Sequence, residues 1–176
     1  KLHSIPVLIG SKKAMLISCL GDIDNAVKIL INASTNNKKI LWCGNGGSAA
    51  DAQHMAAELM GGLRNHSRPP IASIALTTDS SFLTAWANDT DYESIFSRQI
   101  EGIGESGDVL IAISTSGNSN NVINAISIAK SMEISVIILT GISGGMMNES
   151  NADVIIKIPS NDTQRIQEGH LLVEHI

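Results

Sequence analysis

Five short runs of Ile, Leu, Val and Ala, spread through the chain, limit its fold more than any other feature. They span residues 39–43, 71–76, 109–113, 134–139 and 154–158. Each run is almost continuously apolar, which is typical of strands buried on both faces of a parallel sheet. Helical stretches separate several of them, and this alternation indicates strand–helix–strand connections. The sequence therefore predicts an α/β fold, a three-layer sandwich in which helices flank a five-stranded parallel sheet.

Apolar residues at helical spacing predict helices over residues 22–35, 51–63 and 122–129, and from about residue 162 onward. In the last of these, the expected apolar positions are Ile166, Leu171, Leu172 and Ile176. No repeat, low-complexity tract or linker interrupts the chain, so we expect a single domain over residues 1–176. Because the helical pattern continues to the last residue, we expect the C-terminus to be truncated within a helix.

Composition excludes several classes of protein. Hydrophobic residues make up 43% of the 176 residues and the formal net charge is -5, which argues against disorder and against broad nucleic-acid binding. No apolar run approaches the roughly 20 residues that cross a bilayer, and no signal peptide begins the chain. Cys19 and Cys43 lack CxxC spacing, so we expect both to be reduced. These features predict a soluble cytoplasmic protein.

The first strand is followed by a glycine-rich loop, Gly44-Asn45-Gly46-Gly47-Ser48, and then by a helix. Free N–H groups at a helix start attract anions, and glycines let a ligand approach the backbone closely. An ordinary turn with Ser48 as the helix cap explains the same residues. The loop is neither GxGxxG nor a Walker A sequence, so we expect no nucleotide cofactor.

The third strand is followed by a loop rich in hydroxyl groups, Ser114-Thr115-Ser116-Gly117-Asn118-Ser119, and again by a helix. Four hydroxyls in six residues exceed what one helix cap requires. Hydroxyls and backbone N–H groups can donate every hydrogen bond that a phosphate needs. We therefore interpret this loop as a phosphate cradle without Lys or Arg.

Two helices carry candidates for acid–base chemistry or metal binding. His54 and Glu58 are four residues apart on one helix face, and Gln167 and His175 lie on the final helix, with directions roughly 80° apart. Such groups can transfer protons or ligate a metal. Taken alone, a surface ion pair is the better interpretation of His54 and Glu58. Spacing also does not choose His175 over His170.

Three other polar positions are less informative. Asn88-Asp89 suits the binding of sugar hydroxyls, but an ordinary turn is the better interpretation from sequence alone. His3 and His66 have no motif around them, and we expect both at the surface.

Taken together, these segments resemble the phosphoheptose isomerase family, whose members have the SIS (sugar isomerase) fold. The resemblance extends from about Lys39 to the end of the chain. The remaining 38 residues are expected to form an N-terminal helical segment. The matching stretches are residues 43–54, 76–79, 113–119, 139–141 with Gly144-Gly145, and 165–168 with His170 and His175.

The resemblance implies a role for each matching position. Glu58 and His175 would carry the proton transfer, with Glu58 as base and His175 as acid, or the reverse. A zinc ion would be held by His54, Glu58, Gln167 and His175. The substrate would be bound by Asn45, Gly46, Gly47, Ser48, Glu58, Asn88, Asp89, Ser114, Thr115, Ser116, Ser119 and Gln167.

The implied activity is an aldose–ketose isomerisation. It would convert sedoheptulose 7-phosphate to D-glycero-D-manno-heptose 7-phosphate by enediol proton transfer, as the first step of bacterial heptose synthesis for lipopolysaccharide or capsule. The resemblance also implies a homotetramer with active sites between subunits. We expect no nucleic acid or membrane as partner.

Two alternatives and one departure accompany this resemblance. A related SIS protein without catalytic activity binds the bacterial replication initiator, but its positions equivalent to Glu58 and His175 hold residues unsuited to proton transfer. An isomerase or sensor of another sugar phosphate is the second alternative. The family usually has Arg where this chain has Gly62, and Arg64 or Arg68 would have to replace any contact of that arginine.

Overall fold

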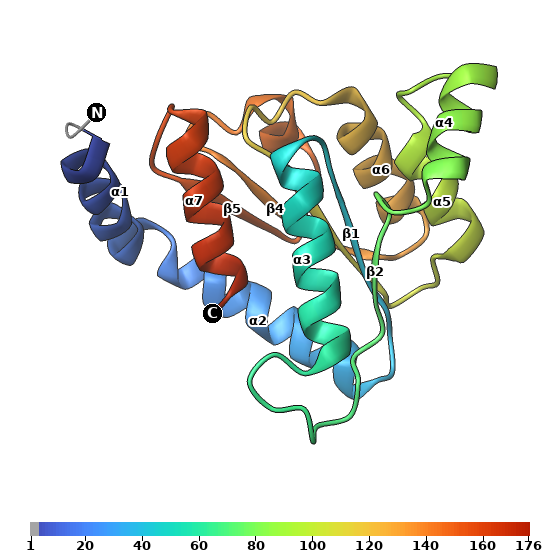
Figure 1. Cartoon of the computed structure of the whole chain (residues 1–176), viewed down its shortest axis with the longest axis horizontal. Helices are drawn as coiled ribbons and strands as arrows, with labels where there is room; N and C mark the ends of the chain where they lie inside the picture. The colour runs from blue at the N-terminus through green and yellow to red at the C-terminus, as the bar shows by residue number, and fades with distance from the viewer. Residues whose placement is uncertain (1–3) are drawn as a thin grey trace.

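A parallel sheet of five strands, in the order β2-β1-β3-β4-β5, forms the centre of the fold. The computed structural model describes residues 4–176 (Figure 1). In chain order, the elements are α1 (Ser4–Ser18), α2 (Leu20–Thr35), β1 (Ile40–Gly44), α3 (Gly47–Gly61), β2 (Ser73–Ala75), α4 (Ser80–Asp89), α5 (Ile95–Ile103), β3 (Val109–Ser114), α6 (Asn120–Ser131), β4 (Ser135–Gly141), the 3-10 helix η1 (Gly145–Glu149), β5 (Val154–Ile158) and α7 (Thr163–Glu174).

The strand order places β1 beside β3, with Ile40 opposite Val109 and Gly44 opposite Ile113. The chain leaves β1 towards β2 on one side and continues from β3 towards β4 on the other. In such doubly wound sheets, ligands bind beyond the carboxyl ends of the strands at the point where the order reverses. Here the loops at that point are the glycine loop after β1 and the hydroxyl loop after β3.

Apolar side chains cover both faces of the sheet and make the fold three-layered. Alternate residues of β3 point in opposite directions, since Ile111 and Ile113 belong to one core cluster and Leu110 and Ala112 to the other. Helices α1, α2, α3 and α7 cover the first face, and α5, α6 and η1 cover the second. On the first face, α3 packs directly against α7 (Figure 1).

The predicted architecture is confirmed. All five expected strands form, within one or two residues of their expected ends, and all pairings are parallel. The N-terminal helical segment corresponds to α1 and α2. His3 lies outside the described residues.

The apolar pattern did not reveal α4 and α5, and it misjudged the buried face of α7. Ile166 is 3% exposed as expected, but Leu171, Leu172 and Ile176 are 36%, 38% and 71% exposed. The buried positions of α7 are instead Ile166, Gly169 and His170. Among the described residues, no helix is both long and apolar enough to cross a membrane.

Candidate active site

The glycine loop brings the start of α3 against α7. Gly46 has a φ of 57° and precedes the first residue of the helix, Gly47. A Cβ atom on Gly47 would overlap the side-chain amide of Gln167. The absence of a side chain at Gly47 thus leaves room for Gln167, which places this predicted ligand beside the predicted substrate loop. The neighbouring Ser48 is only 3% exposed.

The hydroxyl loop is a closed cluster at the start of α6. The Ser114 Oγ lies 3.1 Å from the Ser119 Oγ and 3.5 Å from the Ser116 Oγ. Two backbone N–H groups donate to this cluster, from Gly117 to the Ser114 Oγ and from Asn118 to the Ser116 Oγ, both at 3.2 Å. The structure thus brings three of the four predicted phosphate-binding hydroxyls together.

A cavity of about 260 Å³ opens next to this loop, beyond the carboxyl ends of β3, β4 and β5. Thr115 and Ser116 line it on one side, and Ser143, Ser160 and Thr163 line it on the other. Its lining is rich in hydroxyl groups and carries no Lys or Arg, as expected of a site that would hold a phosphorylated sugar by neutral donors.

His54 and His175 meet where α3 packs against the end of α7. Their Nε2 atoms are 3.1 Å apart, and their rings cross at 63° with centroids 5.2 Å apart. Both side chains are exposed. The contact between two predicted site residues, 121 positions apart in the sequence, depends on the packing of the two helices.

The hydrogen bonds of His175 define its tautomer. Its Nδ1 lies 2.8 Å from the carbonyl oxygen of Leu171. A carbonyl only accepts, so Nδ1 must carry the proton and donate it. In the neutral ring, Nε2 then has a free lone pair, and it accepts a hydrogen bond from the Nε2–H of His54.

Two carboxyl groups lie beside this histidine pair, in the contact between α3 and α7. Burial, together with the nearby Asp51, raises the pKa of Glu174 to about 8. Burial also raises the pKa of Asp51, an effect that His54 partly offsets. A carboxyl with a pKa near 8 is mostly protonated at neutral pH. The contact between α3 and α7 therefore carries less negative charge at neutral pH than two ionised carboxylates, Asp51 and Glu174, would give.

Arg68 binds the C-terminal end of α3, where Glu58 lies. Its Nη2 donates to the carbonyl oxygens of Glu58 at 3.0 Å and Leu59 at 2.6 Å. The Glu58 carbonyl also accepts from the Gly62 N–H, and the Leu59 carbonyl from the Ile71 N–H. A guanidinium is favourable at this negative end of the helix. The position of Arg68 within a polar loop gave no signal of this contact. Of the two arginines considered from the sequence, it is Arg68 that reaches α3.

Gly62 ends α3 in a conformation that disfavours the arginine expected at this position. Its φ is 110°, in the left-handed region, and its N–H donates to the Glu58 carbonyl as a helix cap. A Cβ atom on Gly62 would lie 2.7 Å from the carbonyl oxygen of Asn65. Any side chain here would strain the backbone.

Asn88 and Asp89 are not brought to the other predicted residues. They are the last two residues of α4 rather than part of a turn, and both are exposed. The Asn88 amide donates to the Asp89 carboxylate at 2.7 Å. Figure 1 shows α4 on the right of the view, with α3 between it and α7.

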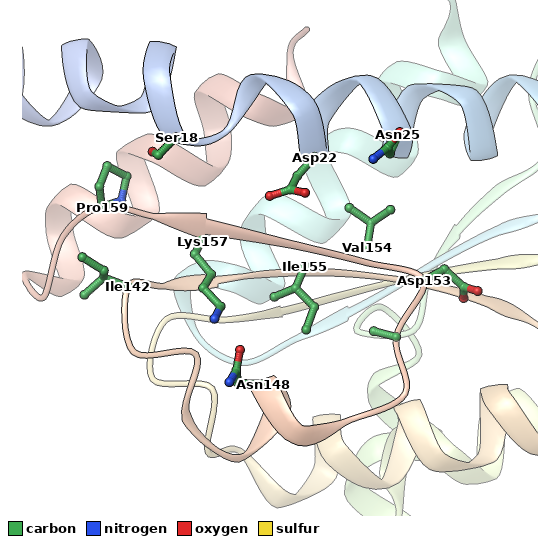
Figure 2. Close-up of a pocket in the computed structure, with 11 residues that line it drawn as sticks. Ser18, Asp22, Asn25, Ile142, Asn148, Asp153, Val154, Ile155, Lys157 and Pro159 are labelled. Atoms are coloured by element: carbon green, nitrogen blue, oxygen red, sulfur yellow. The ribbon is translucent and has the colours of Figure 1, made fainter.

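A larger cavity lies elsewhere, along the free edge of β5. It measures about 560 Å³ and is bordered by Asp22, Asn148 and Lys157 (Figure 2). None of the predicted site residues lines it. Within residues 4–176, no group of three or more His, Cys, Asp or Glu side chains is arranged to hold a metal ion.

Comparison with known proteins places the chain among proteins with this fold. The family model for the SIS domain matches residues 13–141. The phosphoheptose isomerase of Aromatoleum aromaticum is 55% identical over 155 residues, which cover 87% of this chain and 78% of that protein.

Solved structures agree. The phosphoheptose isomerase of Neisseria gonorrhoeae superposes with a TM-score of 0.92 at 41% identity, over 99% of this chain and 92% of that one. The enzyme of Francisella tularensis gives a TM-score of 0.94 at 35% identity, over 98% and 91%. The chain therefore belongs to the phosphoheptose isomerase family of SIS-domain proteins.

Proposed function

We propose that this chain is an aldose–ketose isomerase that converts sedoheptulose 7-phosphate to D-glycero-D-manno-heptose 7-phosphate. The observation that carries the proposal is the packing of α3 against α7, which brings His175 to the helix that bears His54 and Glu58. The name that relatives of about 50% identity share supports the same activity. In this role the chain supplies heptose for lipopolysaccharide or capsule.

Glu58 is the proposed base. It removes a proton from C1 of the ketose and returns it to C2, through a cis-enediol. It lies half-buried on α3, one turn beyond His54, and a positioned carboxylate can serve as a general base.

His175 is the proposed partner that moves the hydroxyl protons. Because its Nδ1–H is held by the Leu171 carbonyl at 2.8 Å, the exchangeable position is Nε2. When it is bound neither to His54 nor to a metal, the Nε2 of a neutral imidazole can take a proton from one substrate hydroxyl and return it to the neighbouring oxygen. The ring stays in place during this exchange because its Nδ1 bond does not change.

The donor set also fits a zinc ion. Two nitrogen ligands on a tetrahedral zinc are separated by about 3.3 Å, given zinc–nitrogen bonds of roughly 2.0–2.1 Å. The two Nε2 atoms of His54 and His175 are 3.1 Å apart, and the Nδ1 bond of His175 is the outer support that ligating histidines usually have. Glu58 lies one turn beyond His54 on α3, whereas Gln167 lies about two turns before His175 on α7, beside Gly47. The histidine pair and Glu58 would hold the ion, and Gln167 is proposed as a further ligand from the family resemblance alone. When bound, it would polarise the substrate carbonyl.

The hydroxyl loop is the proposed binding site of the phosphate. Ser114, Ser116 and Ser119 already lie within 3.5 Å of one another at the start of α6. Thr115 lines the adjoining cavity. Asn45, Gly46 and Gly47 would line the sugar, and Asn88 and Asp89 would reach it from a neighbouring subunit.

A cytoplasmic homotetramer with active sites between subunits completes the proposal. Large apolar side chains remain exposed on the N-terminal helices, with Val7 at 55%, Ile17 at 90% and Leu20 at 53%. Exposed apolar surface of this kind is usually covered by another chain. The distance of α4 from α7 in one chain also favours a site completed by a second copy (Figure 1).

Substitution of the proton-transfer pair tests the proposed reaction. Glu58→Gln and His175→Gln should each lower kcat for sedoheptulose 7-phosphate by a factor on the order of 100 or more, because each removes one proton-transfer group. Binding of inorganic phosphate should survive in both. Glu149→Gln and His66→Gln, at exposed positions outside the site, serve as matched controls. Full activity in either test variant would remove that residue from the mechanism.

A further inference from the structure

Two side-chain amides join the glycine loop to the start of α6. The Nδ2 of Asn45 donates to the Oδ1 of Asn121 at 2.9 Å, and the Nδ2 of Asn121 donates back to the Oδ1 of Asn45 at 2.9 Å. Asn45 follows β1, and Asn121 lies in the first turn of the helix that follows the hydroxyl loop. The pair therefore connects the two loops that meet where the strand order reverses.

Tyr92 adds a third hydrogen bond to this pair. Its hydroxyl donates to the Oδ1 of Asn45 at 2.9 Å. The segment that carries it is tied to α6, because the Asn120 side chain donates to the Glu93 carboxylate at 2.9 Å. Tyr92 itself is 57% exposed. It lies at the rim of a cavity of about 120 Å³ that Asn45 and Gly46 also line.

The hydrogen bonds of Asn45 leave one group free. A carboxamide oxygen has two lone pairs and the nitrogen has two hydrogens. The oxygen of Asn45 accepts from Asn121 and from Tyr92, so both lone pairs are used. The nitrogen donates once, to Asn121, and keeps one N–H. Asn45 thus offers a single donor, and its side chain cannot rotate without breaking three hydrogen bonds.

We propose that Asn121 and Tyr92 are positioning residues that hold Asn45 with its remaining N–H directed at an oxygen atom of the sugar substrate. This inference rests on the proposed function, which places Asn45 against the sugar. Asn121 is only 3% exposed, and a buried amide is costly unless its hydrogen bonds are made. Holding a donor in place before substrate arrives lowers the entropic cost of binding. The same contacts keep the sugar-binding and phosphate-binding loops at a fixed separation.

The kinetic test uses Tyr92→Phe, which removes one hydroxyl and keeps the ring. We expect kcat/KM for sedoheptulose 7-phosphate to fall about tenfold, as for the loss of one hydrogen bond. The melting temperature should change by no more than a few degrees, since the side chain is largely exposed. Ser131→Ala is the matched control, because it removes one hydroxyl hydrogen bond at the far end of α6. It should retain wild-type kinetics.

A double-mutant cycle shows whether Tyr92 acts through Asn45. In an Asn45→Ala background, Tyr92→Phe should cause no further loss of kcat/KM, since the group that it positions is gone. Wild-type kinetics of Tyr92→Phe, or additive losses in the cycle, would overturn the proposal. Failure of the proposed function is a separate result, because the wild-type chain would then be inactive on this substrate.

A measurement without substrate tests the positioning directly. In 15N relaxation experiments, the side-chain amide of Asn45 should be rigid in the wild-type chain and in Ser131→Ala. It should become mobile in Tyr92→Phe and in Asn121→Ala. An Asn45 amide that is equally rigid in Tyr92→Phe would refute the proposal whatever the enzyme acts on.

Discussion

His170 and His175 have the same side chain on the same helix and entirely different environments. His175 is exposed and meets His54, whereas His170 is 0% exposed and lies against the sheet. Neither ring nitrogen of His170 has a hydrogen-bond partner within residues 4–176. Burial lowers the pKa of His170 to about 4. His170 is therefore neutral at pH 7, and the proposed acid–base role belongs to the exposed His175.

The lowered pKa of His170 predicts a pH dependence of stability. Between the unfolded value of 6.5 and the folded value of about 4, the unfolded chain binds the proton and the folded chain does not. Stability from this group is therefore present above pH 6.5 and is lost as the pH falls towards 4. From pH 7 to pH 5, the wild type should lose about 2 kcal/mol more than His170→Leu.

Urea unfolding of the two proteins at both pH values, at equal protein concentration, measures this difference. Each remaining titratable group is common to both proteins, so it cancels to first order. Identical pH dependence in the two proteins would show that His170 does not titrate in this range.

At the scale of a helix, two features at the C-terminal end of α3 hold the backbone around Glu58 in place. Gly62 closes the helix in a left-handed conformation, and Arg68 binds the carbonyls of Glu58 and Leu59. Together they occupy the backbone groups that a helix end leaves without partners. The last turn of α3, which carries the proposed base, is thereby fixed.

The two adjacent glycines provide a matched pair for testing the helix end. Gly62→Ala should destabilise the chain by about 1–3 kcal/mol, because of its φ and the close Asn65 carbonyl. Gly61→Ala should be neutral or stabilising by up to about 1 kcal/mol, since a Cβ there meets open space. Thermal unfolding of both variants measures the contrast. Equal effects would contradict the role of the left-handed cap.

Substitution of Arg68 and Arg64 distinguishes the roles of the two arginines. Arg68→Ala should cost about 1–2 kcal/mol, the usual effect of removing a charged donor from backbone carbonyls. It should also lower kcat several-fold, because the last turn of α3 loosens around Glu58. Arg68→Lys should restore part of both losses. Arg64 is exposed, so Arg64→Ala should stay within about 0.5 kcal/mol of the wild type.

At the scale of the whole molecule, several of the exposed apolar residues lie on the helices at the start and end of the chain. The most exposed is Ile17, at 90%, and Leu171 and Leu172 on α7 are also open. The helix α1 packs against α7, so these residues belong to one region of the surface. Their exposure is the physical basis for expecting further copies of the chain there.

Ile17→Asp tests the assembly. The wild-type chain should have a mass four times the 18.6 kDa of one chain, measured by light scattering after size exclusion. A charge at this position should dissociate it, because an unpaired carboxylate in an apolar contact is costly. Activity should fall with the mass, because the proposed active site lies between subunits. Ile103→Asp, on α5 and 41% exposed, should leave the mass unchanged, and a monomeric wild type would refute the tetramer.

Most of the fold was predictable from the chain itself. Strands buried on both faces are apolar at nearly every position, so β1, β3, β4 and β5 stand out as almost continuous apolar runs. Helices α4 and α5 were not recognised from the sequence pattern, because they are short and α4 buries no residue completely. The sequence pattern also did not identify the buried face of α7, because its apolar residues include both buried and exposed side chains.

The sequence by itself determined the parallel sheet and the two polar loops at its carboxyl edge, because strand periodicity and strand direction are local properties. Only the tertiary structure decided which histidine meets α3. His170 and His175 differ by five residues, or about 140° around the helix, so one faces the sheet when the other faces His54. Tertiary packing also produced three other contacts. Gln167 approaches Gly47, Arg68 donates to the Glu58 carbonyl, and the side-chain amides of Asn45 and Asn121 pair. Each joins residues distant in sequence, and only packing sets their separation.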